Sequence, residues 1–238
     1  ENYDFIAEFE KDNWWYRAKR DLFKVLLKSL KRKYSHSLDL GCGVGSNFEI
    51  LNEFSGKVTG IDFSSKAISY CKNKGYFSLH QMDATNLKFK DESFDLIVCS
   101  DVLEHIDDKK AIKEITRVLK NKGLFIFSVP AHNYLWGPTD IISQHRKRYE
   151  KEDLRELLSK NYKIKKLSYW NFSMFLPDFI FIKTMKMLGR DKKKRNALEF
   201  IPSILNDIIF GFLYIENRLF TRFNNIQGVS IVGVAEKK

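Results

Sequence analysis

Apolar residues alternate between two patterns along the chain. Runs at residues 94–100 and 124–130 are apolar at almost every position, which is typical of parallel strands that are covered on both faces. Shorter strand-like runs stand at residues 37–40 and 57–62. Between these runs, apolar residues recur three and four positions apart, a spacing that predicts amphipathic helices. Strands that alternate with helices predict a doubly wound α/β domain built on a parallel sheet.

Helix start and stop signals give the order of the other elements. A helix is predicted over residues 12–31, with Asp12 as its N-cap, so a helix precedes the first strand. A second helix is predicted to begin at Ser64 and to end before Gly75. Further helices are predicted at residues 47–54, 108–119 and 150–160, and further strands at residues 76–83, 162–170 and 228–237.

The stretch between the last two predicted strands is longer than an α/β unit needs. Its apolar residues predict two helices, the second of which includes Leu198 and Ile201, and the basic run "RDKKKR" at residues 190–195 separates them. Three roles stay open for this stretch: a cap over the core, an amphipathic surface for an anionic membrane, and a homodimer interface. The single domain is therefore divided into a helical lead (1–34), a core (35–170), a helical insertion (171–227) and a final strand (228–238).

The composition is that of a globular protein with a surplus of basic residues. Of the 238 residues, 44% are hydrophobic and 30% are charged, and the net charge is +11 at pH 7. This surplus favours anionic partners such as acidic metabolites, nucleic acid or an anionic membrane. The three cysteines show no paired short spacing, which favours reduced thiols and a cytoplasmic location. No run of about 18 uncharged apolar residues occurs, so no membrane-spanning helix is expected.

Three glycines stand at every second position of "LDLGCGVG", residues 38–45, directly behind the first predicted strand. A strand, a glycine turn and a helix form the first half of a nucleotide-binding unit, in which backbone amides approach a ligand closely. The dinucleotide pattern needs a glycine at position 46, where this chain has Ser46. Instead, the carboxylate of Asp39 precedes the turn, and Asp62 ends the next strand, at the position that holds a ribose diol.

Five segments resemble, in the same order, the motifs of the class I methyltransferases that use S-adenosylmethionine. They are "DLGCGVG", "VTGIDFS", "QMDATNL", "FDLIVCSDVLEHIDD" and "EITRVLKNKGLFIFSVP", spread across residues 38–130. The resemblance implies a Rossmann-like sheet of about seven strands, the last one antiparallel. It also implies S-adenosylmethionine as the cofactor. This molecule has no phosphates and presents an ammonium group, which suits a turn that carries carboxylates.

The resemblance further implies which residues line the cofactor. Asp39 is expected on the side of the methionine ammonium, Asp62 at the ribose hydroxyls, and Asp83 at the adenine amino group. Ordinary turn and cap chemistry is the alternative for Asp39 and Asp62. The full set of expected cofactor-binding residues is Asp39, Gly41, Cys42, Gly43, Gly45, Asp62, Phe63, Asp83, Ala84 and Ser100.

The acceptor is expected at the carboxyl edge of the sheet, where three histidines follow predicted strands. A hydroxyl acceptor must lose a proton, and histidine suits that task because its pKa is near neutrality. His105, His132 and His145 are therefore the candidate catalytic residues, although His105 also fits a packing role. The loop after Pro130 supplies the candidate substrate-binding residues Trp136, Asp140, Arg146, Arg148 and Tyr149. A solvated loop and a hydrophobic lid are the alternatives for this loop.

One further spacing resembles a metal-binding segment. Asp101, Glu104 and His105 have the pattern acid-x-x-Glu-His, which is similar to that of small-RNA 2′-O-methyltransferases and ubiquinone-pathway O-methyltransferases, with His132 as a fourth ligand. Oxygen and imidazole ligands suit a divalent cation that lowers the pKa of a hydroxyl. Against a metal, the first ligand here is Asp, one methylene shorter than Glu, and no metal ligand is assigned.

The sequence thus predicts a methyltransferase that moves a methyl group to a small molecule. The leading hypothesis for the acceptor is a hydroxyl of a sugar, of a lipid-linked compound or of another secondary metabolite. The alternatives are a metal-assisted O-methyltransferase acting on a quinone-like or RNA 2′-hydroxyl acceptor, and a protein that binds S-adenosylmethionine without transferring its methyl group. Nucleic acid is not expected as a partner, because the basic residues are scattered along the chain. In addition, "SDVL" stands after the fourth strand in place of the Asn-Pro-Pro-Tyr-type motif of base N-methyltransferases. Peripheral contact of residues 172–220 with a membrane and a homodimer are the remaining partner hypotheses.

Overall fold

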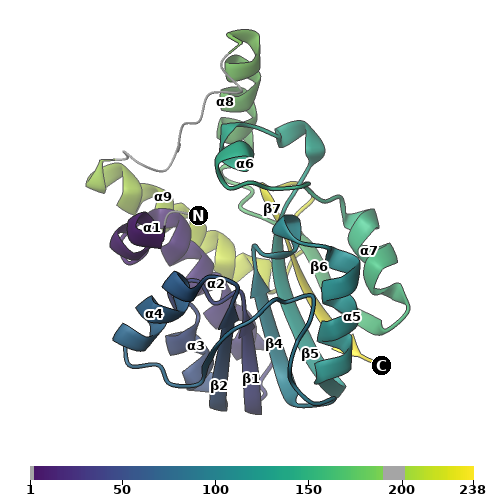
Figure 1. The fold of residues 1–238 in the computed structure, drawn as a ribbon. Helices are drawn as coiled ribbons and strands as arrows, with labels where there is room; N and C mark the ends of the chain where they lie inside the picture. The colour runs from purple at the N-terminus through teal and green to yellow at the C-terminus, as the bar shows by residue number, and fades with distance from the viewer. Residues whose placement is uncertain (1–2, 190–201) are drawn as a thin grey trace.

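A computed structural model describes residues 3–189 and 202–238 of the chain. Its centre is one seven-stranded sheet in the order β3-β2-β1-β4-β5-β7-β6 (Figure 1). Strands β1 to β5 pair in parallel, and β7 is antiparallel to both β5 and β6. The predicted Rossmann-like sheet with an antiparallel last strand is confirmed. The strands are β1 (Tyr34–Leu40), β2 (Ser55–Asp62), β3 (Leu79–Gln81), β4 (Phe94–Ser100), β5 (Leu119–Pro130), β6 (Tyr162–Trp170) and β7 (Ser230–Lys237).

Helices cover both faces of the sheet and form two separate cores. One core joins the sheet to α5 (Asp108–Val118) and α7 (Lys151–Ser159). The other joins it to the helices of the opposite face, which are α2 (Trp14–Ser29), α3 (Phe48–Phe54), α4 (Ser65–Asn73) and α9 (Ser203–Phe220). Because β4 and β5 are buried on both faces, their sequences are almost continuously apolar.

The first long helix, α2, spans residues 14–29 instead of the predicted 12–31, and its cap is different. The side chain of Asn13 accepts a hydrogen bond from the backbone N–H of Trp15 at 2.9 Å, so Asn13 rather than Asp12 caps α2. The predicted cap of α4 is confirmed, since the Ser64 hydroxyl accepts from Ala67 N. Gly75, just past α4, has a φ of 84°, which is the left-handed conformation expected of a helix stop.

Several other observed elements differ from the predicted ones. Strand β3 spans three residues instead of eight, since it lies at the edge of the sheet and is largely exposed. Strand β5 begins at Leu119, so the helix before it ends one residue earlier than predicted. Two helices were not predicted, α1 (Tyr3–Phe9) and α6 (Pro138–Ile142).

The helical insertion packs at two different places. Helix α9 lies along α2, where the Trp14 N–H donates to Asn206 Oδ1 at 2.7 Å and Asn217 Nδ2 donates to Ala18 O at 2.9 Å. Helix α8 (Phe175–Met187) stands above the carboxyl edge of the sheet (Figure 1), and Lys186 Nζ donates to the Tyr134 carbonyl at 3.1 Å. Both helices were predicted, whereas Leu198, Ile201 and the basic run at 190–195 lie outside the described residues.

Among the described helices, none is both long enough and apolar enough to cross a membrane. The boundaries assigned to the lead, the core and the insertion stay predictions.

Candidate active site

The glycine turn between β1 and α3 is held in a conformation that glycine adopts most easily. Gly41, Gly43 and Gly45 have φ angles of 74°, 53° and 95°. A Cβ added at Gly41 would lie 2.3 Å from Cγ2 of Val102, in the segment that follows β4. At Gly43, by contrast, an added Cβ would meet no atom within 4 Å. The turn is therefore packed against the protein at its first glycine and faces open space at its second.

Asp62 connects the end of β2 to this turn. Its Oδ2 accepts a hydrogen bond from the Gly43 N–H at 2.9 Å, and its Oδ1 accepts from the Ser64 N–H at 2.9 Å. Tyr3 of α1 also donates to Oδ1, at 3.2 Å. These contacts are the turn chemistry that was the alternative for Asp62, and they hold its carboxylate beside the glycine turn. Its contact with a ribose stays a prediction.

Asp39 lies beneath the turn and is fully buried. Asn47 Nδ2 donates to its Oδ1 at 3.1 Å, while its Oδ2 has no hydrogen-bond partner in the described part of the chain. Burial raises the pKa of Asp39 to about 7, and the negative charge of Asp62 adds to this rise, although the Asn47 hydrogen bond opposes it. A buried carboxylate oxygen of this kind is suited to a cationic ligand group.

Most of the remaining predicted cofactor residues lie at or just after the carboxyl ends of β2, β3 and β4. Phe63, next to Asp62, is 76% exposed and offers an open aromatic face. Asp83 Oδ1 accepts from the N–H and the hydroxyl of Thr85, both at 2.8 Å, which fixes the orientation of its carboxylate. Ser100 ends β4 and its hydroxyl lies 3.2 Å from that of Ser128 on β5. Their contacts with a cofactor stay predictions, as do those of Cys42 and Ala84, which are buried.

A buried lysine at the end of β4 was missed by the sequence analysis. Lys19 of α2 forms an ion pair with Asp101 and lies 3.4 Å from Ser128 Oγ. Its ammonium group also lies 4.5 Å from the ring centroid of Trp15 and 5.2 Å from that of Trp170. Asp101 has a φ of 54°, an uncommon conformation for a residue other than glycine. One feature of the sequence could have pointed to this lysine: Trp14 and Trp15 stand side by side a few residues before it, and Trp15 contacts its ammonium group.

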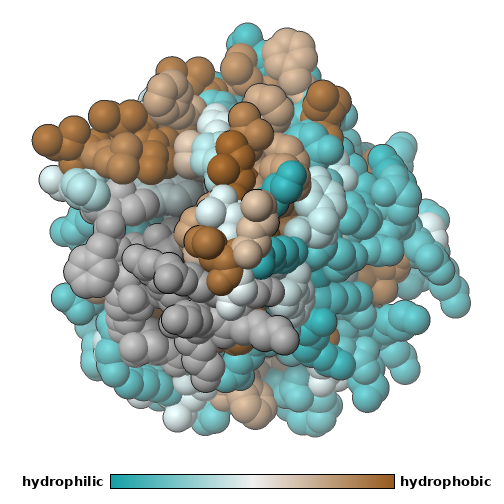
Figure 2. Space-filling model, turned by 90° about the horizontal axis from the view of Figure 1, so that it is seen from above, coloured by the Kyte–Doolittle hydropathy of each residue, from teal (hydrophilic) through white to brown (hydrophobic). Residues whose placement is uncertain are grey.

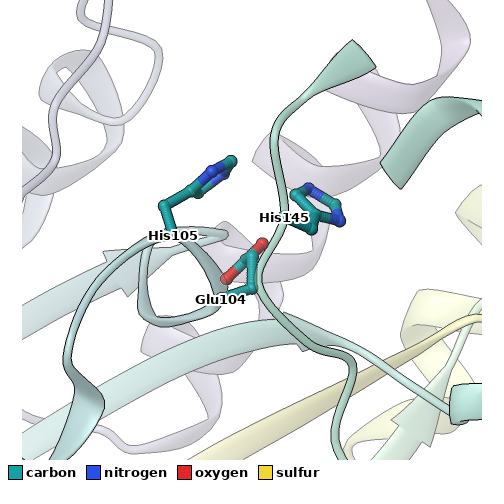
Figure 3. Close-up of side chains that lie close together, drawn as sticks. All are labelled: Glu104, His105 and His145. Carbon is teal, nitrogen blue, oxygen red and sulfur yellow. The ribbon is translucent and has the colours of Figure 1, made fainter. Parts of the chain in front are cut away.

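Two of the three candidate catalytic histidines, His105 and His145, lie close together in space. The side chains of Glu104, His105 and His145 converge (Figure 3), and one potential ligand atom from each lies within 4.8 Å of the others. The rings of His105 and His145 meet edge to face, with their centroids 4.8 Å apart. Glu104 is fully buried, and its backbone carbonyl accepts from the Arg146 N–H at 2.8 Å. The loop that carries His145 is therefore fastened to the segment that carries Glu104 and His105.

His132 does not join this group, so it is not part of the cluster that could hold a metal ion. Its ring is buried and stacks on Tyr134 and Tyr169, with centroid distances of 4.7 Å and 4.6 Å. Its Nδ1 lies 3.0 Å from Glu150 Oε2, at the start of α7. Aromatic side chains enclose the ring, and its Nε2 is buried without a hydrogen-bond partner among the described residues. A catalytic role for His132 stays a prediction.

Three predicted substrate-binding residues hold the loop together. Asp140 is fully buried and accepts from Arg148 Nε at 2.8 Å, with His145 Nδ1 at 2.7 Å from the same oxygen. Burial alone would raise the pKa of Asp140, but the His145 hydrogen bond and the Arg148 charge outweigh it, and its pKa is lowered. Tyr149 is also buried, and its hydroxyl donates to Asp108 Oδ2 at 3.0 Å. Asp140, Arg148 and Tyr149 thus order the loop, and their contact with a substrate stays a prediction.

Trp136 and Arg146 are placed differently from these three. Trp136 is half-buried and the Arg146 side chain is exposed. Their contact with a substrate stays a prediction.

Comparisons with known proteins agree with this geometry. Residues 38–127 match the family model described as a methyltransferase domain. The chain is also 30% identical over 146 residues to a ubiquinone biosynthesis O-methyltransferase of Coxiella burnetii, covering 54% of this chain and 62% of that protein. It is 32% identical over 130 residues to a Methanocaldococcus jannaschii protein, MJ1252, named as uncharacterized, covering 54% of this chain and 50% of that one. The chain thus spans about half the length of the curated relatives it matches.

Solved structures share the whole fold at low identity. A SAM-dependent methyltransferase from Archaeoglobus fulgidus superposes with a TM-score of 0.63 at 18% identity, covering 100% of both chains. The N-methyltransferase NodS from Bradyrhizobium japonicum in complex with S-adenosylhomocysteine superposes with a TM-score of 0.59 at 16% identity, covering 100% of this chain and 99% of that one. Residues 38–127 thus match a methyltransferase domain, and the chain shares its fold with solved S-adenosylmethionine-dependent methyltransferases.

The residues of the glycine turn fit S-adenosylmethionine, the cofactor that the sequence resemblance implies. The free oxygen of buried Asp39 suits the ammonium group of the methionine part, and the open space at Gly43 leaves room for a ligand over the turn. The cofactor supplies an electrophilic methyl group when it is bound. The chain supplies the carboxylates of Asp39 and Asp62 that are expected to orient it.

The raised pKa of Asp39 predicts that cofactor binding depends on pH. In the free protein this pKa is about 7, and a bound ammonium group will lower it because the opposite charge favours the carboxylate. Binding therefore releases a proton near neutrality. We expect the dissociation constant for S-adenosylhomocysteine to rise about tenfold between pH 8 and pH 6. Titration calorimetry at the two pH values checks this, and in Asp39→Asn, which binds more weakly, the pH dependence should vanish. An unchanged pH dependence in this variant would rule out Asp39 as its source.

Proposed function

We propose that the chain transfers the methyl group of S-adenosylmethionine to a hydroxyl group of a small-molecule acceptor bound at the carboxyl edge of the sheet. The observation that supports this best is the pairing of His145 with buried Asp140, 2.7 Å apart, beside His105 and Glu104. Asp140 engages Nδ1 of His145 and leaves Nε2 available. A histidine whose other nitrogen is fixed by a carboxylate is a suitable general base for a hydroxyl.

The transfer itself is an in-line displacement at a sulfonium, so alignment of the acceptor provides most of the acceleration. Effective molarities of about 10⁵ to 10⁸ M are available from orientation alone. The acceptor oxygen forms a bond to the methyl carbon while the bond from that carbon to sulfur breaks, and His145 Nε2 takes the hydroxyl proton. In this proposal His145 is the base, Asp140 is a positioning residue, and the Asp101–Lys19 pair lies beside the methionine end of the cofactor.

The experiment is a labelled-methyl transfer assay with a protein-free metabolite and lipid extract of the organism that encodes the chain. We expect label in a product that survives alkaline hydrolysis, as a methyl ether does, and removal of His145 by His145→Ala should lower the rate about 10²-fold or more. A base-labile methyl ester or an N-methylated amine would contradict a hydroxyl acceptor. If S-adenosylhomocysteine binds but no fraction becomes labelled, the chain is a binding protein rather than an enzyme.

A metal-assisted reaction is the second candidate, because Glu104, His105 and His145 could hold a divalent cation. One carboxylate and two imidazoles suit such an ion, and the Asp140 contact to His145 is the kind of outer hydrogen bond that orients metal-binding histidines. This set differs from the one predicted from sequence, since Asp101 pairs with Lys19 and His132 lies elsewhere. A metal there would lower the pKa of the acceptor hydroxyl.

Chelation distinguishes the two candidates. If His145 acts as the base without a metal, turnover stays unchanged after exhaustive dialysis against a chelator. If a metal acts, turnover is lost on chelation and returns with added divalent ion. The cobalt(II) absorption spectrum of the protein gives an independent readout, since His145→Ala should abolish it only when the ion binds at this group.

A further inference from the structure

The outward face of α9 is a continuous apolar surface. Six large apolar side chains, each between 46% and 75% exposed, recur at three- and four-residue steps along the helix. At 3.6 residues per turn they fall within an arc of about 100°. We call this set the α9 face, and its members are Ile204, Leu205, Ile208, Phe212, Ile215 and Leu219.

The opposite side of α9 is already occupied by the protein. Leu213, Asn217 and Phe220 are buried there, and Asn217 Oδ1 accepts from Trp170 Nε1 at 2.7 Å. Arg218 pairs with Asp21 of α2. The helix packs on the protein through this opposite side, so the α9 face is not needed for packing within the described chain. A helix that is apolar on both sides needs a second apolar environment.

Helix α8 adds exposed apolar residues mixed with lysines. Leu176, Ile180 and Met187 are exposed, and so are Lys183 and Lys186. The space-filling view from above shows apolar surface gathered on the side where α9 lies in Figure 1 and again near the centre, with hydrophilic surface on the other side (Figure 2). The sequence that joins the two helices is also basic, and the whole chain carries a net charge of +11.

We propose that the α9 face and the exposed side of α8 dock on the surface of an anionic lipid membrane. The exposed apolar side chains of both helices match the acyl boundary of such a surface, and the lysines of α8 match its negative headgroups. A second copy of this chain fits less well, because it would bring the same positive charges to the interface. Since none of the described helices is suited to crossing a bilayer, the contact is interfacial.

Docking in this way would bring the acceptor loop to the membrane. Helix α8 touches that loop through Lys186 and the Tyr134 carbonyl, and the Gly137 segment packs close to Ile182 of α8. On the proposed function, this favours an acceptor that carries a lipid. The membrane contact itself does not depend on the reaction, so a failure of one leaves the other standing.

The test is flotation of the purified full chain with vesicles of phosphatidylcholine mixed with phosphatidylglycerol, and with phosphatidylcholine alone. We expect the chain to float with the anionic vesicles, to float less with the neutral ones, and to lose binding as salt rises. The double substitution Ile208→Gln and Ile215→Gln should lower the partition coefficient about a hundredfold, since each removes a large apolar contact. Both residues are exposed, and unchanged S-adenosylhomocysteine binding verifies that the variant is folded.

The matched control is Phe77→Gln, which removes an apolar side chain that is 94% exposed and lies just before β3, away from both helices. This variant should float like the unmodified chain. The proposal is overturned if the unmodified chain stays at the bottom with anionic vesicles, or if the two variants lose binding equally. It is also overturned if light scattering shows a dimer that the double substitution dissociates while vesicles bind neither form, because the α9 face would then be a contact between copies.

Discussion

Replacing Asp62 with alanine will raise the dissociation constant for S-adenosylhomocysteine by about 10²- to 10⁴-fold, since hydrogen bonds to a charged group contribute about 1.5–3 kcal/mol each and two ribose hydroxyls are expected to donate to this carboxylate. The substitution also removes the acceptor that fixes the Gly43 and Ser64 amides at 2.9 Å. Both losses act in the same direction. Titration calorimetry at pH 8 measures the effect.

The matched control for this prediction is Asp91→Ala, which removes a carboxylate that is exposed and pairs with Arg117. Its affinity should equal that of the unmodified chain. If Asp62→Ala binds S-adenosylhomocysteine as tightly as this control, the ribose position has been assigned to the wrong residue.

Replacing Arg148 with methionine will destabilise the fold by about 3 kcal/mol, because removal of one partner of a buried ion pair leaves the other charge uncompensated. Asp140 is fully buried and keeps only His145 and the Gly137 amide as partners in this variant. Urea unfolding followed by circular dichroism measures the change in the free energy of unfolding. Arg155→Met is the control, since Arg155 and Glu152 form an exposed pair on α7, and its effect should stay below about 0.5 kcal/mol.

The Arg148 effect should also depend on pH. The pKa of Asp140 is lowered in the folded chain, so its ion pair adds stability above the ordinary carboxyl pKa, and this stability is lost as the pH falls through the lowered value. The unmodified chain and Arg148→Met should therefore approach each other in stability on acidification. An effect of Arg148→Met as small as that of Arg155→Met at pH 7 would mean that Asp140 does not depend on this partner.

The sequence predicted the central part of the fold because the physical signals there are local. Strands β4 and β6 have the predicted bounds. Their sequence patterns can be recognised without knowledge of the tertiary structure. Helix α1 was not predicted because its contacts are distant in sequence. Tyr3 reaches Asp62 across 59 positions, and Asp4 reaches Lys66 across 62.

The cofactor side of the site could be predicted more fully than the acceptor side for a similar reason. The glycine turn and its carboxylates follow one another closely in the chain, so their spacing carries the information. Lys19 meets Asp101 across 82 positions, and no pattern in the sequence connects them. Arg148 and Asp140 also show that a charged residue in a loop looks the same in sequence whether it binds a ligand or is buried in a pair.

The most direct test of the account is calorimetric titration of the unmodified chain with S-adenosylhomocysteine and, separately, with NAD. The glycine turn has Ser46 where a dinucleotide site needs glycine, and it places buried Asp39 beneath the ligand position. We expect one bound S-adenosylhomocysteine per chain, with a proton released near neutral pH, and no heat from NAD. Binding of NAD, or no binding of S-adenosylhomocysteine at pH 8, would contradict it.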